Sequence, residues 1–224
     1  MVFVRWAMLV ELFSCSATWK GIKVASLTYF SYSTVIDGLC KDGLVLDALD
    51  WFSKMKKRGI VPNVITYTSL IHRLCAIGER KEAMRLFNGM VGRRITPTVQ
   101  TFSVLVDALC KEGMVVDAQG MMEIMVRQGV KPDRITYNSF MDGYCLKGDM
   151  DGAKKVLNMM IVKGYEPDLR SYNILIDGYC KNKRMVEAMT MFEEMSSKGL
   201  VPNVVTLSGK NSACSRSFSQ DENG

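Results

Sequence analysis

The chain has 224 residues, of which 48% are hydrophobic and 23% charged, and its formal net charge is +6. This composition is ordinary for a folded protein and excludes a globally disordered one. No run approaches the ~18 uncharged apolar residues of a membrane-spanning helix, so we expect no membrane association. The positive balance favours an anionic partner such as nucleic acid.

Residues 1–28 are expected to form a divergent leader. The segment holds Arg5, Lys20 and Lys23, several serines and only one acidic residue, Glu11. A basic, Ser-containing and acid-poor composition is typical of an organellar transit peptide. The segment is therefore a candidate transit peptide, and a divergent leader without a targeting role is the alternative.

From residue 29 onward the sequence repeats itself every 35 residues. All five prolines keep this interval, and so do five of the seven cysteines, one alanine, one methionine and one aromatic residue per unit. The registered series are Pro62, Pro97, Pro132, Pro167 and Pro202; Cys40, Cys75, Cys110, Cys145 and Cys180; Ala48, Ala83, Ala118, Ala153 and Ala188; Met55, Met90, Met125, Met160 and Met195; and Tyr32, Tyr67, Phe102, Tyr137 and Tyr172. Self-similarity of this kind is the signature of a repeat architecture.

Each unit is predicted to be a helix–turn–helix hairpin. In residues 64–98, apolar residues at helical spacing fill the first half, Gly78 interrupts them, and the spacing resumes before Pro97. One hairpin cannot bury both its faces, but stacked hairpins can. We therefore predict an all-α fold, an α-solenoid forming a right-handed superhelix of about five repeats. Their bounds are 29–63, 64–98, 99–133, 134–168 and 169–203.

The registered cysteines and methionines are assigned to the core. Equivalent positions in stacked hairpins lie ~10 Å apart, which exceeds the separation that a disulfide tolerates, and there is no CxxC pair. We expect buried, reduced thiols, which favour a reducing compartment. Methionine fills irregular gaps between hairpins, so the methionine series predicts packing rather than a metal site.

No catalytic constellation is present in the sequence. His72 is the only histidine, and it replaces an aspartate that the other units carry, so we interpret it as a surface substitution. The sequence has no zinc ligand set, deaminase signature, phosphate loop or GxSxG motif. We predict no enzyme, no metal and no cofactor. The equivalent aspartates are Asp37, Asp107, Asp142 and Asp177.

A sixth unit begins at residue 204 and is expected to abort. Lys210 and Asn211 occupy the slots that Leu175 and Ile176 fill in the fifth unit, and burying the polar pair is costly. The Ser-rich residues 209–224 are predicted to be a disordered tail. Uncapped ends of a short array predict self-association.

Several motifs recur in register over residues 29–208. Tyr-Asn or Tyr-Ser stands near the start of a unit, Asp-Gly-Tyr-Cys-Lys follows, and Lys-Gly-x-x-Pro-Asp ends it, most clearly in residues 136–168 and 171–203. The pattern resembles the pentatricopeptide repeat family, in the class built only of 35-residue repeats, and is similar to plant fertility-restorer-like members. The resemblance implies sequence-specific binding of single-stranded RNA, about one nucleotide per repeat. It also implies organellar RNA processing, stability or translation, with protein partners for processing. The mitochondrion is the expected location and the chloroplast the alternative.

The resemblance assigns base selection to two residues per repeat, one after the aromatic residue and one after the terminal proline. These pairs are Ser33 with Asn63, Thr68 with Thr98, Ser103 with Asp133, Asn138 with Asp168, and Asn173 with Asn203. A residue two positions before the aromatic would sandwich the bases. These residues are Phe30, Ile65, Gln100, Ile135, Arg170 and Val205. The implied order from the first repeat is A, a purine, G, U and a pyrimidine, running 5′ to 3′.

Two interpretations of these polar residues stay open from the residues alone. The Ser, Thr and Asn after the aromatic can bond a base edge, and we expect four of the five on an exposed face. They can equally bond their own backbone in the first helical turn. Lysines after the cysteine contact the RNA backbone if the resemblance holds, or are solvated cations at a helix C-terminus. These lysines are Lys41, Lys111 and Lys181.

Three other functions compete with RNA binding. One is a protein-binding scaffold resembling tetratricopeptide repeats, which the period of 35 and the Asn and Asp pairs argue against. Another is an RNA-processing enzyme that uses these repeats for targeting, which needs a nuclease or deaminase domain. The third is a truncated product with little binding.

Overall fold

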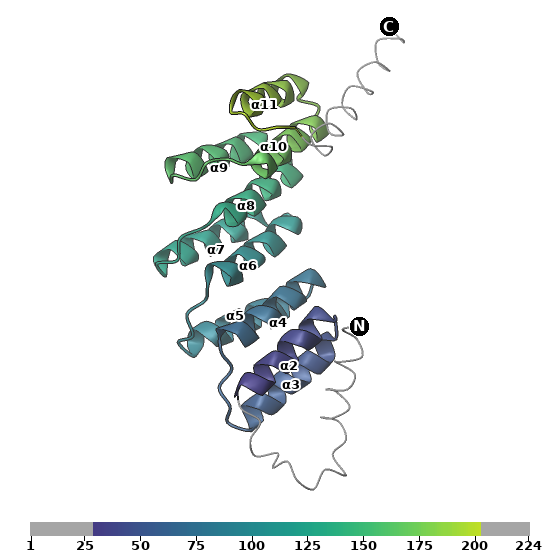
Figure 1. Cartoon of the computed structure of the whole chain (residues 1–224), viewed down its shortest axis with the longest axis vertical. Coiled ribbons are helices and arrows are strands. Elements are labelled where there is room, and N and C mark those ends of the chain that lie inside the picture. The colour runs from purple at the N-terminus through teal and green to yellow at the C-terminus, as the bar shows by residue number, and fades with distance from the viewer. Residues whose placement is uncertain (1–28, 203–224) are drawn as a thin grey trace. The chain divides into compact units, whose positions relative to one another are not determined.

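The computed structural model describes residues 29–202, and within that range the chain forms ten helices and no strand (Figure 1). The leader and the predicted sixth unit and tail lie outside the described residues. No helix within residues 29–202 has the length and apolarity to cross a bilayer. The helices are α2 (Tyr29–Lys41), α3 (Val45–Lys57), α4 (Val64–Ala76), α5 (Arg80–Gly92), α6 (Val99–Lys111), α7 (Val115–Arg127), α8 (Arg134–Lys147), α9 (Met150–Val162), α10 (Leu169–Lys181) and α11 (Met185–Ser197).

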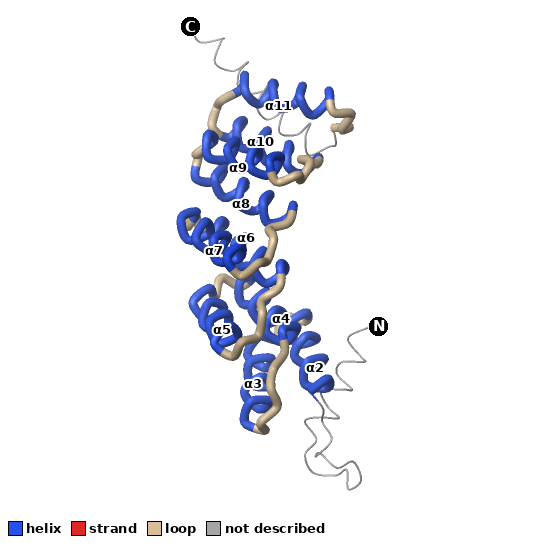
Figure 2. The backbone as a smooth tube through the Cα atoms, turned by 90° about the vertical axis from the view of Figure 1, so that its left-hand side faces the viewer, coloured by secondary structure: helices blue, strands red, loops and turns tan. Residues whose placement is uncertain are grey.

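The helices fall into two compact units, one ending at Thr96 and the other beginning at Pro97. In the first unit, α2 packs against α3 and α4, and α4 packs against α5. In the second unit, α6, α8 and α10 pack side by side, and each forms a hairpin with the helix that follows it (Figures 1 and 2). Both units are therefore segments of an α-solenoid made of stacked hairpins, which confirms the predicted fold class.

The first helix of each hairpin after α2 is N-capped by the residue that follows the terminal proline. In each case a side-chain oxygen of that residue accepts a hydrogen bond from the backbone N–H three positions later, which satisfies an otherwise unpaired donor of the first turn. The four N-cap residues are Asn63, Thr98, Asp133 and Asp168. The helix starts are thus made by residues already assigned to base selection.

The registered series form part of the core. The alanines are 0–3% exposed and the methionines are fully buried. Cys40, Cys110 and Cys145 are buried, and burial raises the pKa of each thiol to about 12. Cys75 and Cys180 are half-buried, and no cysteine within residues 29–202 forms a disulfide. Three of the five registered cysteines are therefore buried as predicted, and the other two are partly accessible.

Glycine sets the closeness of the first helices in the second unit. A Cβ added to Gly143 of α8 would lie 2.6 Å from both Cβ and Sγ of Cys110 in α6. A Cβ added to Gly178 of α10 would likewise lie 2.7 Å from Sγ of Cys145 in α8. Because real Cβ atoms do not approach other atoms so closely, neither position accepts a larger residue without separating the helices.

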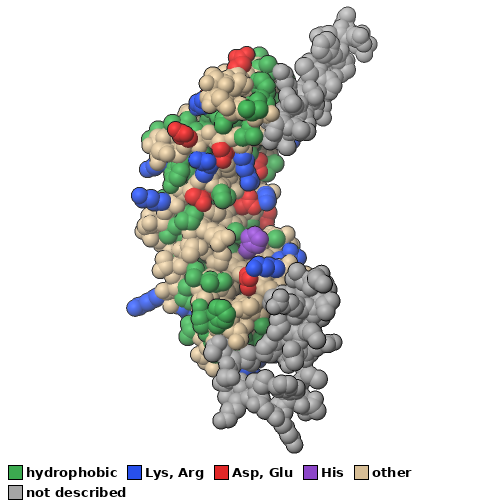
Figure 3. Space-filling model, in the orientation of Figure 1, with side chains coloured by type: hydrophobic (Ala, Val, Ile, Leu, Met, Phe, Trp, Pro, Cys, Tyr) green, Lys and Arg blue, Asp and Glu red, His purple; other side chains and the backbone are tan. Residues whose placement is uncertain are grey.

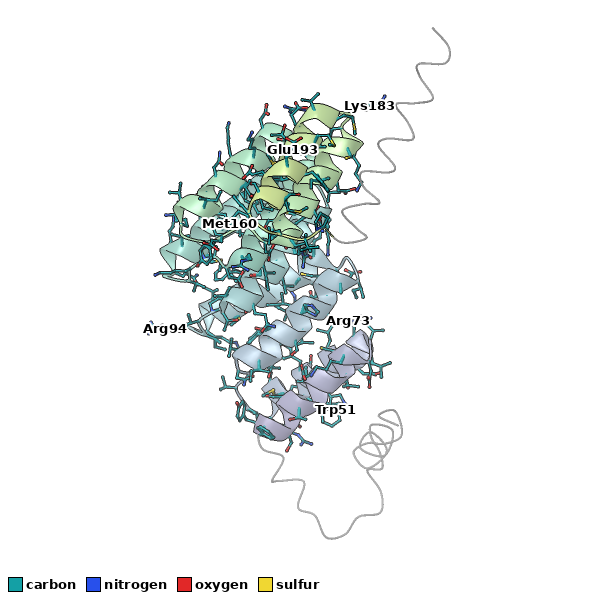
Figure 4. All side chains as sticks on the ribbon, turned by 45° about the horizontal axis from the view of Figure 1, so that its top comes forward. Trp51, Arg73, Arg94, Met160, Lys183 and Glu193 are labelled. Carbon is teal, nitrogen blue, oxygen red and sulfur yellow. The ribbon has the colours of Figure 1, made fainter. Side chains whose placement is uncertain are left out.

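Two turns carry a non-glycine residue in the left-handed backbone region. Arg94 has φ of 59° and Lys183 has φ of 60°, whereas glycine with positive φ stands at the equivalent turns of the other repeats. A side chain is disfavoured in this region, so both turns store strain. Figure 4 shows both side chains projecting from the surface at a helix end.

Candidate nucleic-acid interface

The selecting pair of the third repeat is joined by one buried hydroxyl. Thr136, in the first turn of α8, is 0% exposed, and its Oγ1 donates to Oδ1 of Asp133 at 2.7 Å. The same Oγ1 lies 2.6 Å from Oγ of Ser103, which stands on the neighbouring helix α6. The structure therefore unites residues that are 30 positions apart in the sequence, through a threonine that belongs to the next repeat.

The first repeat is built in the same way. Thr66 is 0% exposed, and its Oγ1 donates to Oδ1 of Asn63 at 2.8 Å and lies 2.9 Å from Oγ of Ser33. The amide Nδ2 of Asn63 donates to the Tyr29 hydroxyl at 2.8 Å. Because Oδ1 also accepts from the backbone N–H of Thr66, the orientation of the Asn63 amide is fixed on both sides.

In the fourth repeat, the bridging residue is Ser171. Its Oγ lies 2.7 Å from Oδ1 of Asn138 and 3.0 Å from Oδ1 of Asp168. Nδ2 of Asn138 donates to the same carboxylate at 3.5 Å, and Arg134 lies 3.6 Å from its other oxygen. Burial opposes ionisation of Asp168, but the hydrogen bonds from Ser171 and Asn138 and the charge of Arg134 hold its pKa below the ordinary value. The carboxylate is therefore ionised at neutral pH.

The structure corrects the expected exposure of the residues after the aromatic. Ser33 and Ser103 are each 7% exposed and Asn138 is 2% exposed, whereas Thr68 and Asn173 are half-buried. Ser33, Ser103 and Asn138 are covered because α2 packs against α4, α6 against α8, and α8 against α10. Ser33 and Ser103 also lie within hydrogen-bond distance of the backbone carbonyl four residues earlier. The single hydroxyl proton of each serine can therefore be donated either to this carbonyl or to the bridging hydroxyl of the next repeat.

For two predicted pairs, the structure does not describe both members within one compact unit. Thr68 belongs to the first unit and Thr98 to the second. Asn203, the partner predicted for Asn173, lies outside the described residues, as does the predicted sandwich residue Val205.

The described sandwich residues are all exposed. Phe30, Ile65 and Ile135 are 57–69% exposed although they are large and apolar, and Gln100 and Arg170 are also exposed. Each stands one turn before a base-selecting side chain on the same helix. These residues are therefore free to contact a ligand beside the selecting pairs.

A groove of about 610 Å³ opens on the second unit between α8 and α10. It is lined by Asp142, Asp168, Leu169, Arg170, Asn173, Ile174 and Asp177. Two predicted selecting residues, from consecutive repeats, and one predicted sandwich residue therefore share one concave site.

The three registered lysines are held in ion pairs with the aspartate one turn earlier. Lys41 lies 2.6 Å from Asp37, and equivalent pairs join Lys111 with Asp107 and Lys181 with Asp177. The lysine side chains are 66–75% exposed, so their charges still face solvent. Figure 3 shows basic and acidic side chains interspersed on the second unit. The ion pairs are compatible with both interpretations of these lysines, contact with the RNA backbone and a solvated cation at a helix C-terminus.

The fourth repeat departs from this arrangement because Leu146 stands in the lysine slot. Asp142 consequently has no lysine one turn later. Burial, together with the nearby charges of Asp107 and Asp177, raises its pKa against the attraction of Lys181 and Arg170. This part of the groove is therefore locally acidic.

Sequence reasoning missed the hydroxyl residue that precedes the aromatic. The five members are Ser31, Thr66, Thr101, Thr136 and Ser171, and the last four are 0% exposed. A signal for them was present, since every repeat carries Ser or Thr at this place. No group of acidic, His or Cys side chains within residues 29–202 could hold a metal ion, and His72 is exposed on α4.

Comparison with solved structures shows the same fold. The pentatricopeptide repeat protein PPR10 in complex with an 18-nt psaJ RNA element matches with a TM-score of 0.78 and 21% identity over 96% of this chain and 30% of that one. PPR10 from maize matches with a TM-score of 0.61 and 30% identity over 89% of this chain and 27% of that one. The PPR domain of Arabidopsis thaliana protein-only RNase P 1 in complex with tRNA matches with a TM-score of 0.67 and 19% identity over 81% of this chain and 96% of that one.

This chain thus spans about a third of the length of PPR10. No curated protein matches its sequence. The model of the PPR repeat family matches residues 28–76, 62–111, 105–146, 132–181 and 168–209, which together span the whole helical array. The chain belongs to the PPR repeat family, the pentatricopeptide repeat proteins.

Proposed function

We propose that this chain binds single-stranded RNA in a sequence-specific manner, with about one nucleotide per repeat. The observation that carries the proposal is the hydrogen-bonded pairing of Ser33 with Asn63, Ser103 with Asp133 and Asn138 with Asp168. Paired polar side chains held rigidly beside exposed apolar residues suit a base that is bonded at its edge and contacted on its faces.

The third repeat presents two hydrogen-bond acceptors. Oδ1 of Asp133 is occupied by Thr136, whereas Oδ2 has no partner among the described residues. Ser103 contributes a second acceptor if its proton is used in the contact with Thr136. Guanine alone among the four bases offers two adjacent donors, N1–H and the 2-amino group, on its Watson–Crick edge. The third repeat therefore selects G, in agreement with the order implied by the family resemblance.

The first and fourth repeats each combine one donor with one acceptor. Ser33 accepts and the second N–H of Asn63 donates, a combination that suits adenine or cytosine, and the resemblance favours adenine. Asn138 offers an N–H beside the ionised Asp168, a combination that uracil also satisfies with N3–H and O4, and the resemblance favours uracil. The second and fifth repeats select a purine and a pyrimidine, as the resemblance implies.

The exposed sandwich residues hold each base from its faces, at ~1–3 kcal/mol per base by analogy with aromatic stacking. Lys41, Lys111 and Lys181 contribute a salt-sensitive attraction to the phosphates. In this proposal the chain acts by binding, and any cleavage of the RNA is supplied by a partner.

The setting we propose is organellar RNA processing, stability or translation, in the mitochondrion rather than the chloroplast. This assignment follows from the family resemblance and the basic composition of residues 1–28. The location of a fluorescent fusion of the whole chain tests it.

A fluorescence-anisotropy titration of the whole chain tests RNA binding. The probes are a 10-mer that contains A-G-G-U-C, the same RNA with G and U exchanged, and a DNA version, each at two salt concentrations. Base reading predicts tighter binding to the first RNA at both salt concentrations. Equal, salt-sensitive binding to all probes would leave only an electrostatic surface, and no binding by the folded protein would favour a protein-binding scaffold.

A further inference from the structure

We propose that Thr136, and equally Thr66 and Ser171, are positioning residues that fix which hydrogen-bonding atoms the selecting pairs present to a base. The inference rests on the proposed function and goes beyond it. All three side chains are 0% exposed, so none of them can touch RNA. Each nevertheless contacts both members of a selecting pair.

Proton balance in the third repeat supports the proposal. The Thr136 hydroxyl has one proton, and Oδ1 of Asp133, 2.7 Å away, can only accept when the carboxylate is ionised. The 2.6 Å contact between Thr136 and Ser103 therefore needs the proton of Ser103. The hydroxyl of Ser103 is left with lone pairs only, so it faces a base as an acceptor.

Removal of the Thr136 hydroxyl frees the proton of Ser103. The carbonyl of Val99, one turn back on the same helix and 2.8 Å from Ser103 Oγ, remains as an acceptor, and the proton is no longer committed to Thr136, so a base can compete for it. Ser103 would become either donor or acceptor, and a base that offers two donors would lose its advantage. The cap of α8 survives this change, because the backbone N–H of residue 136 still donates to Asp133 at 2.8 Å.

The fourth repeat uses the same device on an amide. The Ser171 hydroxyl lies 2.7 Å from Oδ1 of Asn138, which holds the amide oxygen inward and leaves Nδ2 on the side of Asp168. Without this hydroxyl, only the long 3.5 Å hydrogen bond from Nδ2 to Asp168 would hold the orientation of the amide. In the first, third and fourth repeats, one buried hydroxyl therefore sets the polarity of the residue that we propose reads the base.

The test compares Thr136→Val with the wild-type chain. Valine keeps the shape of threonine and loses only the hydroxyl. Affinities are measured by anisotropy for four RNAs that differ only at the third base, and for four that differ only at the fourth. Thr136→Ser keeps the hydroxyl and serves as the rescue. Thr34→Val removes an exposed hydroxyl of α2 that bonds only the backbone of Phe30, and serves as the matched control.

We expect Thr136→Val to reduce the preference for G at the third base by about tenfold. Selection at the fourth base should stay unchanged, and Thr136→Ser and Thr34→Val should behave like the wild type. A folded Thr136→Val protein that keeps its preference for G, even with a lower Tm, would show that the hydroxyl is only structural. Absence of base preference in the wild type would instead refute the proposed function, so the two failures are distinguishable.

Discussion

Replacement of Gly143 by alanine tests how closely the first helices of the second unit pack. The added Cβ would lie 2.6 Å from both Cβ and Sγ of Cys110 and 3.2 Å from its Cα. Two of these three atoms belong to the backbone or are fixed directly to it, so a side-chain rotation cannot relieve the overlap. Overpacking of this kind costs about 3 kcal/mol at the upper end of its usual range. The higher helix propensity of alanine returns about 1 kcal/mol.

We therefore expect Gly143→Ala to lower the free energy of unfolding by about 2 kcal/mol. Gly120→Ala is the matched control, since Gly120 lies within α7 of the same unit and an added Cβ there meets no atom within 4 Å. The control should gain about 1 kcal/mol from helix propensity alone. The two variants thus differ by about 3 kcal/mol although the chemical change is identical.

Thermal and urea unfolding, followed by circular dichroism at 222 nm, measure both variants. For a chain of this size, 1 kcal/mol shifts Tm by about 2–4 °C, so Tm should fall by about 4–8 °C in Gly143→Ala and rise by about 2–4 °C in Gly120→Ala. Equal stability of the two variants would refute the reasoning, because it would mean that α8 does not approach Cys110 as closely as described.

Three further predictions concern the groove, a turn and the thiols. Leu146→Lys places a cation one turn after Asp142. We expect tighter RNA binding, and a plot of log affinity against log salt concentration should be steeper by about 0.7. An unchanged slope would exclude a phosphate path along this site. Arg94→Gly should stabilise the protein by about 1 kcal/mol in urea unfolding because it relieves a left-handed side chain, whereas Arg94→Ala should bring no gain. At pH 8 an alkylating reagent should modify Cys110 at least about tenfold more slowly than Cys75, because burial raises the pKa of the Cys110 thiol to about 12. Mass spectrometry of the peptides measures both rates of modification. Equal rates would contradict the burial of Cys110.

The fold was predictable because its evidence lies along the sequence. The interval of 35 residues, the prolines at the unit ends and the helical spacing between them determine the hairpins, and the stacking of hairpins follows from the faces that remain unburied. The exposed face expected for most of the residues after the aromatic was wrong for Ser103, which is buried. Its cover comes from α8 of the next repeat, and the sequence pattern of one helix does not show which neighbour lies over it.

The contacts between repeats could not be obtained from periodicity. The clash of a Cβ added to Gly143 with Cys110, at 2.6 Å, depends on the distance between two helices, and the bridge through Thr136 depends on where two side chains end in space. The pair of Asp107 with Lys111 is different, because its spacing of four residues was visible in the sequence and indicates an ion pair on one helix face. Its interpretation still needed the exposure of the lysine, which the structure supplies.

The most direct test of base reading is the substitution Asn138→Ser. It converts the fourth selecting pair, Asn138 with Asp168, into the serine–aspartate pair of the third repeat, and Ser171 remains in place to bridge it. Anisotropy titrations of the wild-type and variant chains would use two RNAs, A-G-G-U-C and A-G-G-G-C, within otherwise identical 10-mers. The account predicts that the wild type prefers U at the fourth base and that the variant prefers G. Equal affinities of a folded variant for both RNAs, or an unchanged preference for U, would contradict it.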